Sequence, residues 1–184
     1  MKHTNKLLAG AALGAALALA APEASAQGIL SGNSRRMGAT LNIGGSIGAG
    51  IGAFRLTPEF HYAFGGRGMT GPAIGVGVDL LIPGFGVGAF GRFAWNIQPL
   101  DGVSFFITPY GGLSVGGLFG ELASLFYLGI HFGGEVRFIF ADRFFLTVRP
   151  IGFTVPITVG EVGGMAGGGA GFGYDGAFGL GATF

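Results

Sequence analysis

The chain has 184 residues, the size of a single domain, and contains no cysteine, which excludes a disulfide framework and a Cys-ligated metal site. It holds 41 glycines, yet a mean hydropathy of +0.62 and a charged share of only 10% exclude a disordered glycine-rich linker. The net charge of +1 provides no basic stripe for a nucleic-acid partner, so the composition indicates a membrane protein or a deeply buried core.

The first 26 residues have the features of a Sec signal peptide. Two lysines precede an apolar run from Leu7 to Ala21, and a small-residue cleavage motif ends at Ala26. The apolar run is shorter than the roughly 20 residues that a membrane-spanning helix needs. We therefore expect residues 1–26 to be removed on export, leaving one domain, residues 27–184, with eight arginines and eight acidic residues.

Eight segments of the mature chain alternate between bulky apolar residues and small or polar ones, a period of two that predicts β-strands. No stretch offers about 18 uninterrupted apolar residues, which argues against membrane helices. Each segment is close to or longer than the roughly 9 to 11 residues that a tilted strand needs to cross a bilayer. The segments are 39–49, 54–64, 73–82, 85–97, 103–117, 125–140, 144–155 and 170–184.

The charged residues inside these segments lie on the face opposite the bulky apolar side chains. In segment 54–64, for example, Phe54 and Phe60 share one face, while Arg55 and Glu59 share the other. The charged residues of this face are Arg55, Glu59, Asp79, Arg92, Glu135, Arg137, Arg149 and Asp175. The remaining charges are expected in the N-terminal lead or in connections: Arg35, Arg36, Arg67, Asp101, Glu121, Asp142, Arg143 and Glu161.

A face composed mostly of glycine with a few charges suits the crowded interior of a narrow barrel, where charges need partners. A soluble β-sandwich would instead expose a face rich in Lys, Glu, Thr and Ser. Closing the sheet also removes unpaired edges, which lipid does not tolerate. If residues across the turn at 141–143 pair so that their numbers sum to 284, Glu135 lies opposite Arg149, and Glu135→Ala would leave Arg149 unpaired.

The last segment ends on alternating apolar residues and a terminal aromatic ring. Phe178, Leu180, Ala182 and Phe184 share one face, and glycines occupy much of the other. A soluble domain more often ends in a polar, mobile tail.

Together, the signal peptide, the eight segments, the inward charges and the terminal Phe184 resemble bacterial outer-membrane β-barrels of the small eight-stranded OmpA transmembrane and OmpX type. The resemblance covers the mature chain and implies an all-β, eight-stranded antiparallel transmembrane barrel with up-and-down topology. It also implies Sec export to the outer membrane of a Gram-negative bacterium. The implied partners are outer-membrane lipid, lipopolysaccharide, periplasmic chaperones and the barrel-assembly machinery, which in this family reads a last strand closed by an aromatic residue.

The connections are expected in two sets, one at each end of the barrel. Those on the periplasmic side would be 65–72, 98–102 and 141–143, and those on the outer side 50–53, 83–84, 118–124 and 156–169. Aromatic girdles are expected near the two ends. One girdle would include Phe64, Ile97, Val103, Phe140, Phe144 and Phe184, with Trp95 and Tyr62 close by, and the other Phe54, Phe85, Phe126 and Phe172.

Several functions remain open besides a structural, membrane-integrity role with a charge-filled interior. The abundance of small inward residues leaves a narrow pore or a slot for a small apolar ligand possible. A lipid A-modifying enzyme is another alternative, but barrel deacylases carry a Ser two residues after a lipid-facing His, whereas here Gly133 follows His131, which points inward. We expect His61 and His131 to form hydrogen bonds inside the barrel, and we predict no catalytic, metal or cofactor site. A secreted glycine-rich surface protein is the alternative outside the membrane.

Overall fold

The computed structural model describes residues 35–48, 51–64, 69–82, 85–99, 105–119, 123–140, 143–162 and 165–184. The predicted signal peptide lies outside these residues. Among the described residues, no helix is long and apolar enough to cross a membrane. The described elements are β1 (Met37–Gly48), β2 (Ile51–Ala63), β3 (Gly71–Ile82), β4 (Phe85–Asn96), β5 (Phe105–Phe119), β6 (Ala123–Phe140), β7 (Phe144–Val162), β8 (Met165–Ala170) and β9 (Gly173–Thr183).

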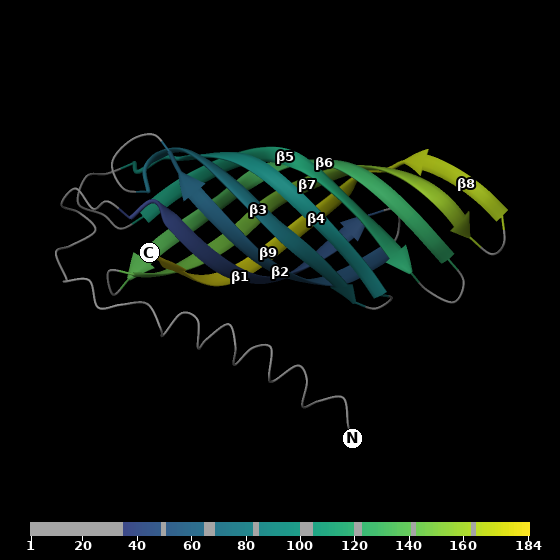
Figure 1. Ribbon diagram of the computed structural model, residues 1–184, viewed down its shortest axis with the longest axis horizontal. Coiled ribbons are helices and arrows are strands. Elements are labelled where there is room, and N and C mark those ends of the chain that lie inside the picture. Colours follow the sequence, from purple (N-terminus) through teal and green to yellow (C-terminus); the bar gives the residue numbers. More distant parts are fainter. Residues whose placement is uncertain are drawn as a thin grey trace, which may run out of the picture.

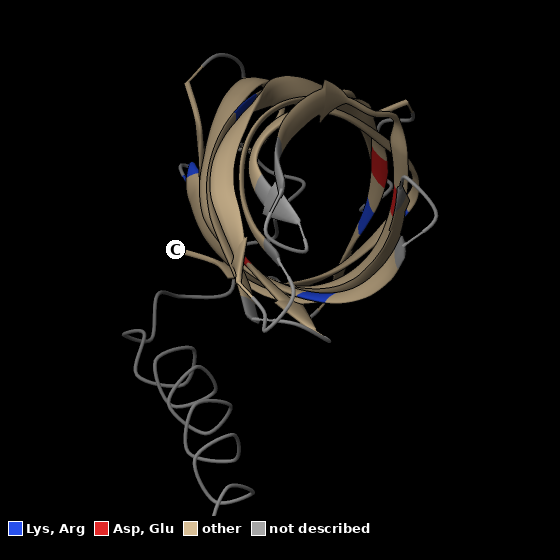
Figure 2. Cartoon of the chain, turned by 90° about the vertical axis from the view of Figure 1, so that its right-hand side faces the viewer, with Lys and Arg blue, Asp and Glu red and all other residues tan. Residues whose placement is uncertain are grey.

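The strands form a closed antiparallel barrel, visible end-on in Figure 2. Strands that follow one another from β1 to β7 pair as neighbours, β9 pairs with β7, and pairing of β9 with β1 closes the ring. The eighth strand is divided into β8 and β9 by an interruption at Gly171 and Phe172, and both parts pair with β7. The predicted eight-stranded, up-and-down antiparallel barrel is confirmed.

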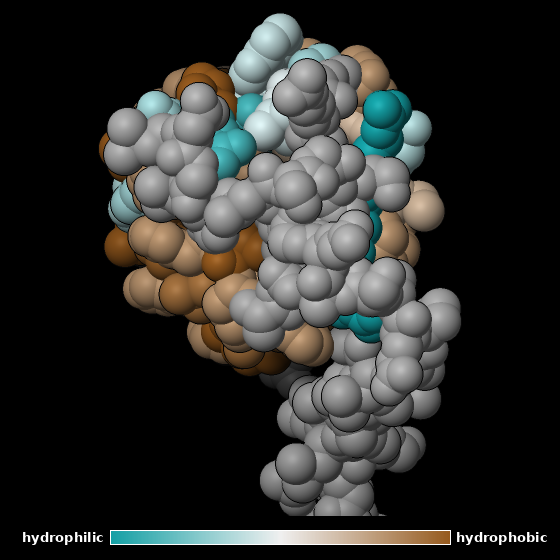
Figure 3. Space-filling model, turned by 90° about the vertical axis from the view of Figure 1, so that its left-hand side faces the viewer, coloured by the Kyte–Doolittle hydropathy of each residue, from teal (hydrophilic) through white to brown (hydrophobic). Residues whose placement is uncertain are grey.

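The two faces of the barrel follow the sequence alternation directly. In β2, the inward residues Thr57, Glu59 and His61 are buried, whereas the outward residues Phe54 and Phe60 are exposed. Side chains on a strand point alternately to opposite faces, so each strand places its bulky apolar residues outside and its small or polar residues inside. Figure 3 shows hydrophobic residues gathered over the flank of the barrel.

The two ends of the barrel differ in shape. We call the end near Arg35 and Phe184 the terminus end, and the opposite end, where β7 turns back into β8, the hairpin end. At the hairpin end β6, β7 and β8 extend beyond the other strands (Figure 1). At the terminus end, β3 begins at Gly71. The backbone φ angle of this residue is 88°, a left-handed conformation that favours glycine.

The expected connection 156–169 is wrong, because β7 continues to Val162 and pairs with β8. The alternation persists through this stretch, with Ile157 and Val159 exposed on the outward face. Pairing with β6 on one side and β8 on the other therefore outweighs the glycines that indicated a loop. Glu161 consequently lies in a strand and not in a connection.

Pairing of β6 with β7 follows the expected register only beside the turn. Val136 pairs with Val148 and Phe140 with Phe144, and in both pairs the residue numbers sum to 284 as predicted. The register then shifts between Gly134 and Val136, so that Gly134 pairs with Ile151. This irregularity accommodates one extra residue in β7, and it lies at Glu135, next to the most highly charged part of the interior.

Candidate functional site

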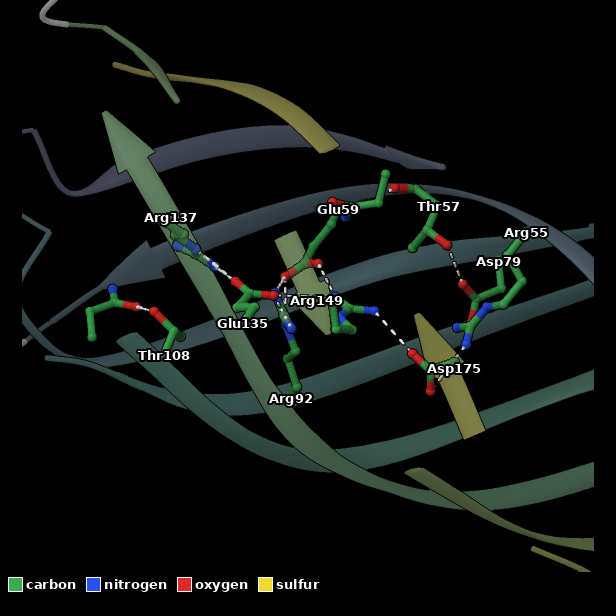
Figure 4. A network of polar contacts seen from close by, with 12 residues as sticks. Arg55, Thr57, Glu59, Asp79, Arg92, Thr108, Glu135, Arg137, Arg149 and Asp175 are labelled. Carbon is green, nitrogen blue, oxygen red and sulfur yellow. Dashed lines mark hydrogen bonds and ion pairs between the residues drawn. The ribbon is translucent and has the colours of Figure 1, made fainter. Parts of the chain in front are cut away.

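The eight charged residues predicted to face inward come from six strands and form one cluster inside the barrel, which we call the lumen charge network (Figure 4). Seven of them are buried, and Arg55 keeps 17% of its side chain exposed. Burial of so many ionised groups requires close pairing, since an isolated buried charge is very unfavourable.

Glu135 lies at the centre of one part of the network. Its carboxylate is 2.5 Å from Arg137 Nη2, 2.9 Å from Arg92 Nη1 and 3.3 Å from Arg149 Nη2. Glu59 lies 2.6 Å from Arg92 Nη2 and 3.7 Å from Arg149 Nη2. Two carboxylates and three guanidinium groups therefore form one ion-paired group that joins β2, β4, β6 and β7.

Arg55 lies in the second part of the network, closer to the hairpin end. Its Nη2 lies 2.6 Å from Asp79 Oδ2, and its Nη1 lies 3.5 Å from Asp175. Thr57 Oγ1 donates a hydrogen bond of 2.6 Å to the other oxygen of Asp79. Arg149 Nη1, 3.7 Å from Asp175 Oδ1, links this part to the group around Glu135.

Glu135 and Arg149 form an ion pair, but the register shift means that they are not direct register partners as predicted, and the expected consequence is wrong. Arg149 is also near Glu59 and Asp175, so removal of the Glu135 carboxylate would not leave it unpaired. Among the ion pairs of the described residues, Glu135 is the sole carboxylate near Arg137. Arg137 is therefore the group left without an acid, an outcome that strand register alone did not reveal.

The expected hydrogen bonds are not formed by His61, nor by Nε2 of His131. Both ring nitrogens of His61 and Nε2 of His131 are buried and find no hydrogen-bond partner among the described residues. His61 instead makes an edge contact with Phe145 at a ring-centroid distance of 5.5 Å, and His131 makes one with Phe90 at 5.6 Å. Both histidines are thus held by aromatic contacts.

A layer of buried apolar side chains lies inside the barrel at the terminus end. Its members, all at most 4% exposed, are Ala63, Ala73, Ala94, Phe106 and Phe145. The three alanines are consecutive register partners across β2, β3 and β4.

The sequence reasoning missed this layer, although it carries a signal. The pairs Phe105-Phe106 and Phe144-Phe145 place aromatic residues on both faces of a strand and so interrupt the alternation. An apolar residue on the charged face therefore indicates apolar packing inside the barrel at that level.

The residues of the expected assembly signal lie on the outward face of β9 and just beyond it. Phe178, Leu180 and Phe184 are exposed, and Ala182 is half-buried. Phe184 N donates a hydrogen bond of 3.0 Å to Met37 O, and the Phe184 ring lies 6.1 Å from that of Phe60. The end of the chain is therefore tied to β1 at the closing seam of the barrel.

Most residues of the two expected aromatic girdles are exposed near the ends of their strands. Phe64, Ile97, Phe140, Phe184, Trp95 and Tyr62 lie at the terminus end, and Phe54, Phe126 and Phe172 lie toward the hairpin end. Phe144 is half-buried, and Val103 and the side chain of Phe85 lie outside the described part of the chain.

The described side chains do not assemble a metal site, since no three His, Asp or Glu residues in those ranges are placed to share an ion. The carboxylates of the interior instead contact arginines. The arrangement can hold opposite charges together inside a barrel.

Comparison with known proteins supports the fold. No protein-family model matches the chain, and no curated protein sequence matches it. The crystal structure of the N-terminal β-barrel domain of Pseudomonas aeruginosa OprF is similar, with a TM-score of 0.52 and 11% sequence identity over 80% of this chain and 97% of that domain. The chain therefore has the barrel fold of that domain, although very few residues are shared.

Proposed function

We propose that the chain is an integral outer-membrane protein of a Gram-negative bacterium with a structural, membrane-integrity role. In this proposal the Sec pathway exports it, periplasmic chaperones and the barrel-assembly machinery insert it, and its flank contacts outer-membrane lipid and lipopolysaccharide. Phe178, Leu180, Ala182 and Phe184 serve as the assembly signal.

The observation that carries the proposal is the inverted distribution of polarity. Large apolar side chains are exposed around the barrel, while arginines and carboxylates are buried inside it. Such an extensive apolar surface is unfavourable in water, whereas in lipid it is the expected exterior of a closed barrel. The closed ring also satisfies the backbone hydrogen bonds that a bilayer cannot satisfy.

The lumen charge network favours a barrel that does not conduct ions. Its oppositely charged groups lie within 2.5 to 3.7 Å of one another across the interior, and the apolar layer lies beyond them at the terminus end. An ion crossing the barrel would have to separate these pairs in a low-dielectric environment. The proposed role is therefore that of a closed barrel and not of a porin.

A non-catalytic role completes the proposal. His131, the histidine considered for an enzyme, contacts Phe90 and lies 6.2 Å from the Tyr110 ring, centroid to centroid, so it points into the interior and away from lipid. This position does not suit attack on a lipid substrate.

Two measurements test the proposal. Cell fractionation should place the mature chain in the outer membrane, and boiling should change its gel mobility, because a folded barrel resists detergent until heated. A mature chain recovered as a soluble periplasmic or secreted protein would refute the membrane location. In planar bilayers the folded protein should be silent, and steady single-channel openings would refute the closed interior.

A further inference from the structure

Three leucines line the inner wall of the barrel at the hairpin end. Leu81, Leu118 and Leu125 face inward from β3, β5 and β6, and all three are half-buried, unlike the buried apolar layer at the terminus end. The leucines interrupt the alternation in the sequence, because each adjoins an outward apolar residue: Ile82, Phe119 and Phe126. An apolar surface inside a barrel that is only partly covered requires an explanation.

Register places these leucines in one continuous row with Arg55. Arg55 pairs with Leu81, Leu81 with Gly86, Gly86 with Leu118, and Leu118 with Leu125. Gly86 brings the first two leucines together, because a Cβ built there would lie 2.6 Å from Leu118 Cδ2 and 2.9 Å from Leu81 Cβ. We call the three leucines of this row, Leu81, Leu118 and Leu125, the leucine arc.

Tyr127 lies beside the arc on the same inner wall. It is the next inward residue after Leu125, and its hydroxyl lies where a Cβ at Gly88 or Gly116 would collide with it. Its ring therefore lies along the wall of β4 and β5 and does not extend across the lumen. The two glycines make room for the Tyr127 hydroxyl against the wall.

Arg55 and the two carboxylates that it contacts favour a ligand with an uncharged head group. Arg55 is the most exposed member of its ion-paired group, with 17% of its side chain accessible against 7% for Asp79 and 6% for Asp175. A cationic ligand group would be repelled by the guanidinium, which is the most accessible charge. An anionic ligand group would be repelled by the two carboxylates beside it. An uncharged oxygen, by contrast, accepts a hydrogen bond from the guanidinium without charge repulsion.

We propose that the leucine arc and Arg55 form a binding site for one small, uncharged amphiphile with a short aliphatic body and a hydroxyl or carbonyl head. The aliphatic body contacts Leu81, Leu118 and Leu125, and the head accepts a hydrogen bond from Arg55. The occupant is a small molecule because an eight-stranded barrel encloses room only for side chains or one small ligand. Beyond the site, the lumen charge network blocks passage of the ligand, so the ligand binds at the hairpin end and does not cross the barrel. The inference adds a ligand to the proposed membrane barrel.

The test uses the full mature chain in lipid nanodiscs with 13C-labelled leucine methyl groups. Octan-1-ol is titrated as the uncharged probe, with octanoate and octylammonium as anionic and cationic probes of the same chain length. We expect saturable shifts of the Leu81, Leu118 and Leu125 methyl signals with octan-1-ol, and at least about fivefold weaker binding of both charged probes. The lipid-facing Leu113 and Leu128 report partition into the bilayer and should shift without saturation.

Two variants of β5 provide a matched pair. Leu118→Ala removes the central contact of the arc and should weaken octan-1-ol binding about tenfold, since one leucine side chain contributes roughly that factor. Leu113→Ala, five residues earlier on the outward face, should leave binding unchanged. Leu125→Ala repeats the inward substitution on β6 should Leu118→Ala fail to fold.

Three results would overturn the inference: shifts at the arc that do not saturate, tighter binding of octanoate or octylammonium than of octan-1-ol, or equal losses in Leu118→Ala and Leu113→Ala. Failure of the chain to insert into nanodiscs would instead count against the proposed membrane function. The two failures are therefore distinguishable.

Discussion

The two ends of the barrel interior carry apolar side chains with different surroundings. At the terminus end, Phe106 and Phe145 combine with three alanines, and all five residues are buried. At the hairpin end, the three leucines of the leucine arc, two of which flank Gly86, are half-buried. At the terminus end large rings lie with small partners and are buried, whereas at the hairpin end three leucines of intermediate size are only half-buried. The inward apolar side chains are therefore less accessible at the terminus end than at the hairpin end.

The difference predicts that the stability of the barrel depends more on its fully buried inward groups than on the half-buried leucines. Removing Glu135, which is buried and contacts three arginines, should have the largest effect. We expect Glu135→Ala to lower the free energy of unfolding by about 4 kcal/mol, because it leaves Arg137 buried without an acid. Urea unfolding in lipid measures this loss. Glu135→Gln, which keeps the shape and part of the hydrogen bonding, should lose less, and an unchanged midpoint in Glu135→Ala would contradict the prediction.

The buried apolar layer at the terminus end should contribute almost as much to stability. Phe145→Ala removes a fully buried ring that contacts His61 and lies 5.7 Å below the Arg137 guanidinium, measured from Cζ to the ring centroid. We expect a loss of about 3 kcal/mol from the cavity it creates. The same urea series tests it, with Phe144→Ala, the neighbouring residue on the outward face, as control. If Phe145→Ala lost less free energy of unfolding than Phe144→Ala, the buried apolar layer would not be a stabilising layer.

The outer rim of the terminus end should matter less for stability than for assembly. Deletion of Phe184 removes one backbone hydrogen bond to Met37 and one ring contact with Phe60, which predicts a loss of about 1 kcal/mol. Insertion into the outer membrane should fall much more, because the proposed assembly signal is lost. The yield of heat-modifiable barrel in cells and the urea midpoint of refolded protein separate the two effects. Parallel losses in both would remove the signalling role.

The smallest effect on stability is expected at the hairpin end. Leu118→Ala should change the free energy of unfolding by about 0.5 kcal/mol, because the leucine is half-buried and its removal creates no closed cavity. Comparing its urea midpoint with that of Phe145→Ala tests the contrast between the ends directly. A loss as large as that of Phe145→Ala would show that the hairpin end is packed as tightly as the terminus end.

Much of the fold could be predicted from the sequence because strand alternation is local. Arg55 and Phe54 must lie on opposite faces once the segment is a strand, and the same reasoning assigned all eight network residues. The extension of β7 beyond Val155 was harder to predict, since its glycine-rich surroundings also indicate a loop. Pairing with β6 and β8, which is not local, decided it.

The sequence by itself determined which side chains face inward, the number of strands and the closed antiparallel topology. The first two follow from the periodicity of each strand. The third follows because the backbone hydrogen-bonding groups at the edges of a sheet need partners. The tertiary structure decided which inward groups meet. The register shift at Glu135, the sharing of Arg149 among three acids and the row from Arg55 to Leu125 depend on strands far apart in the sequence. Contacts across a lumen depend on register and barrel closure together, and alternation within one strand fixes neither.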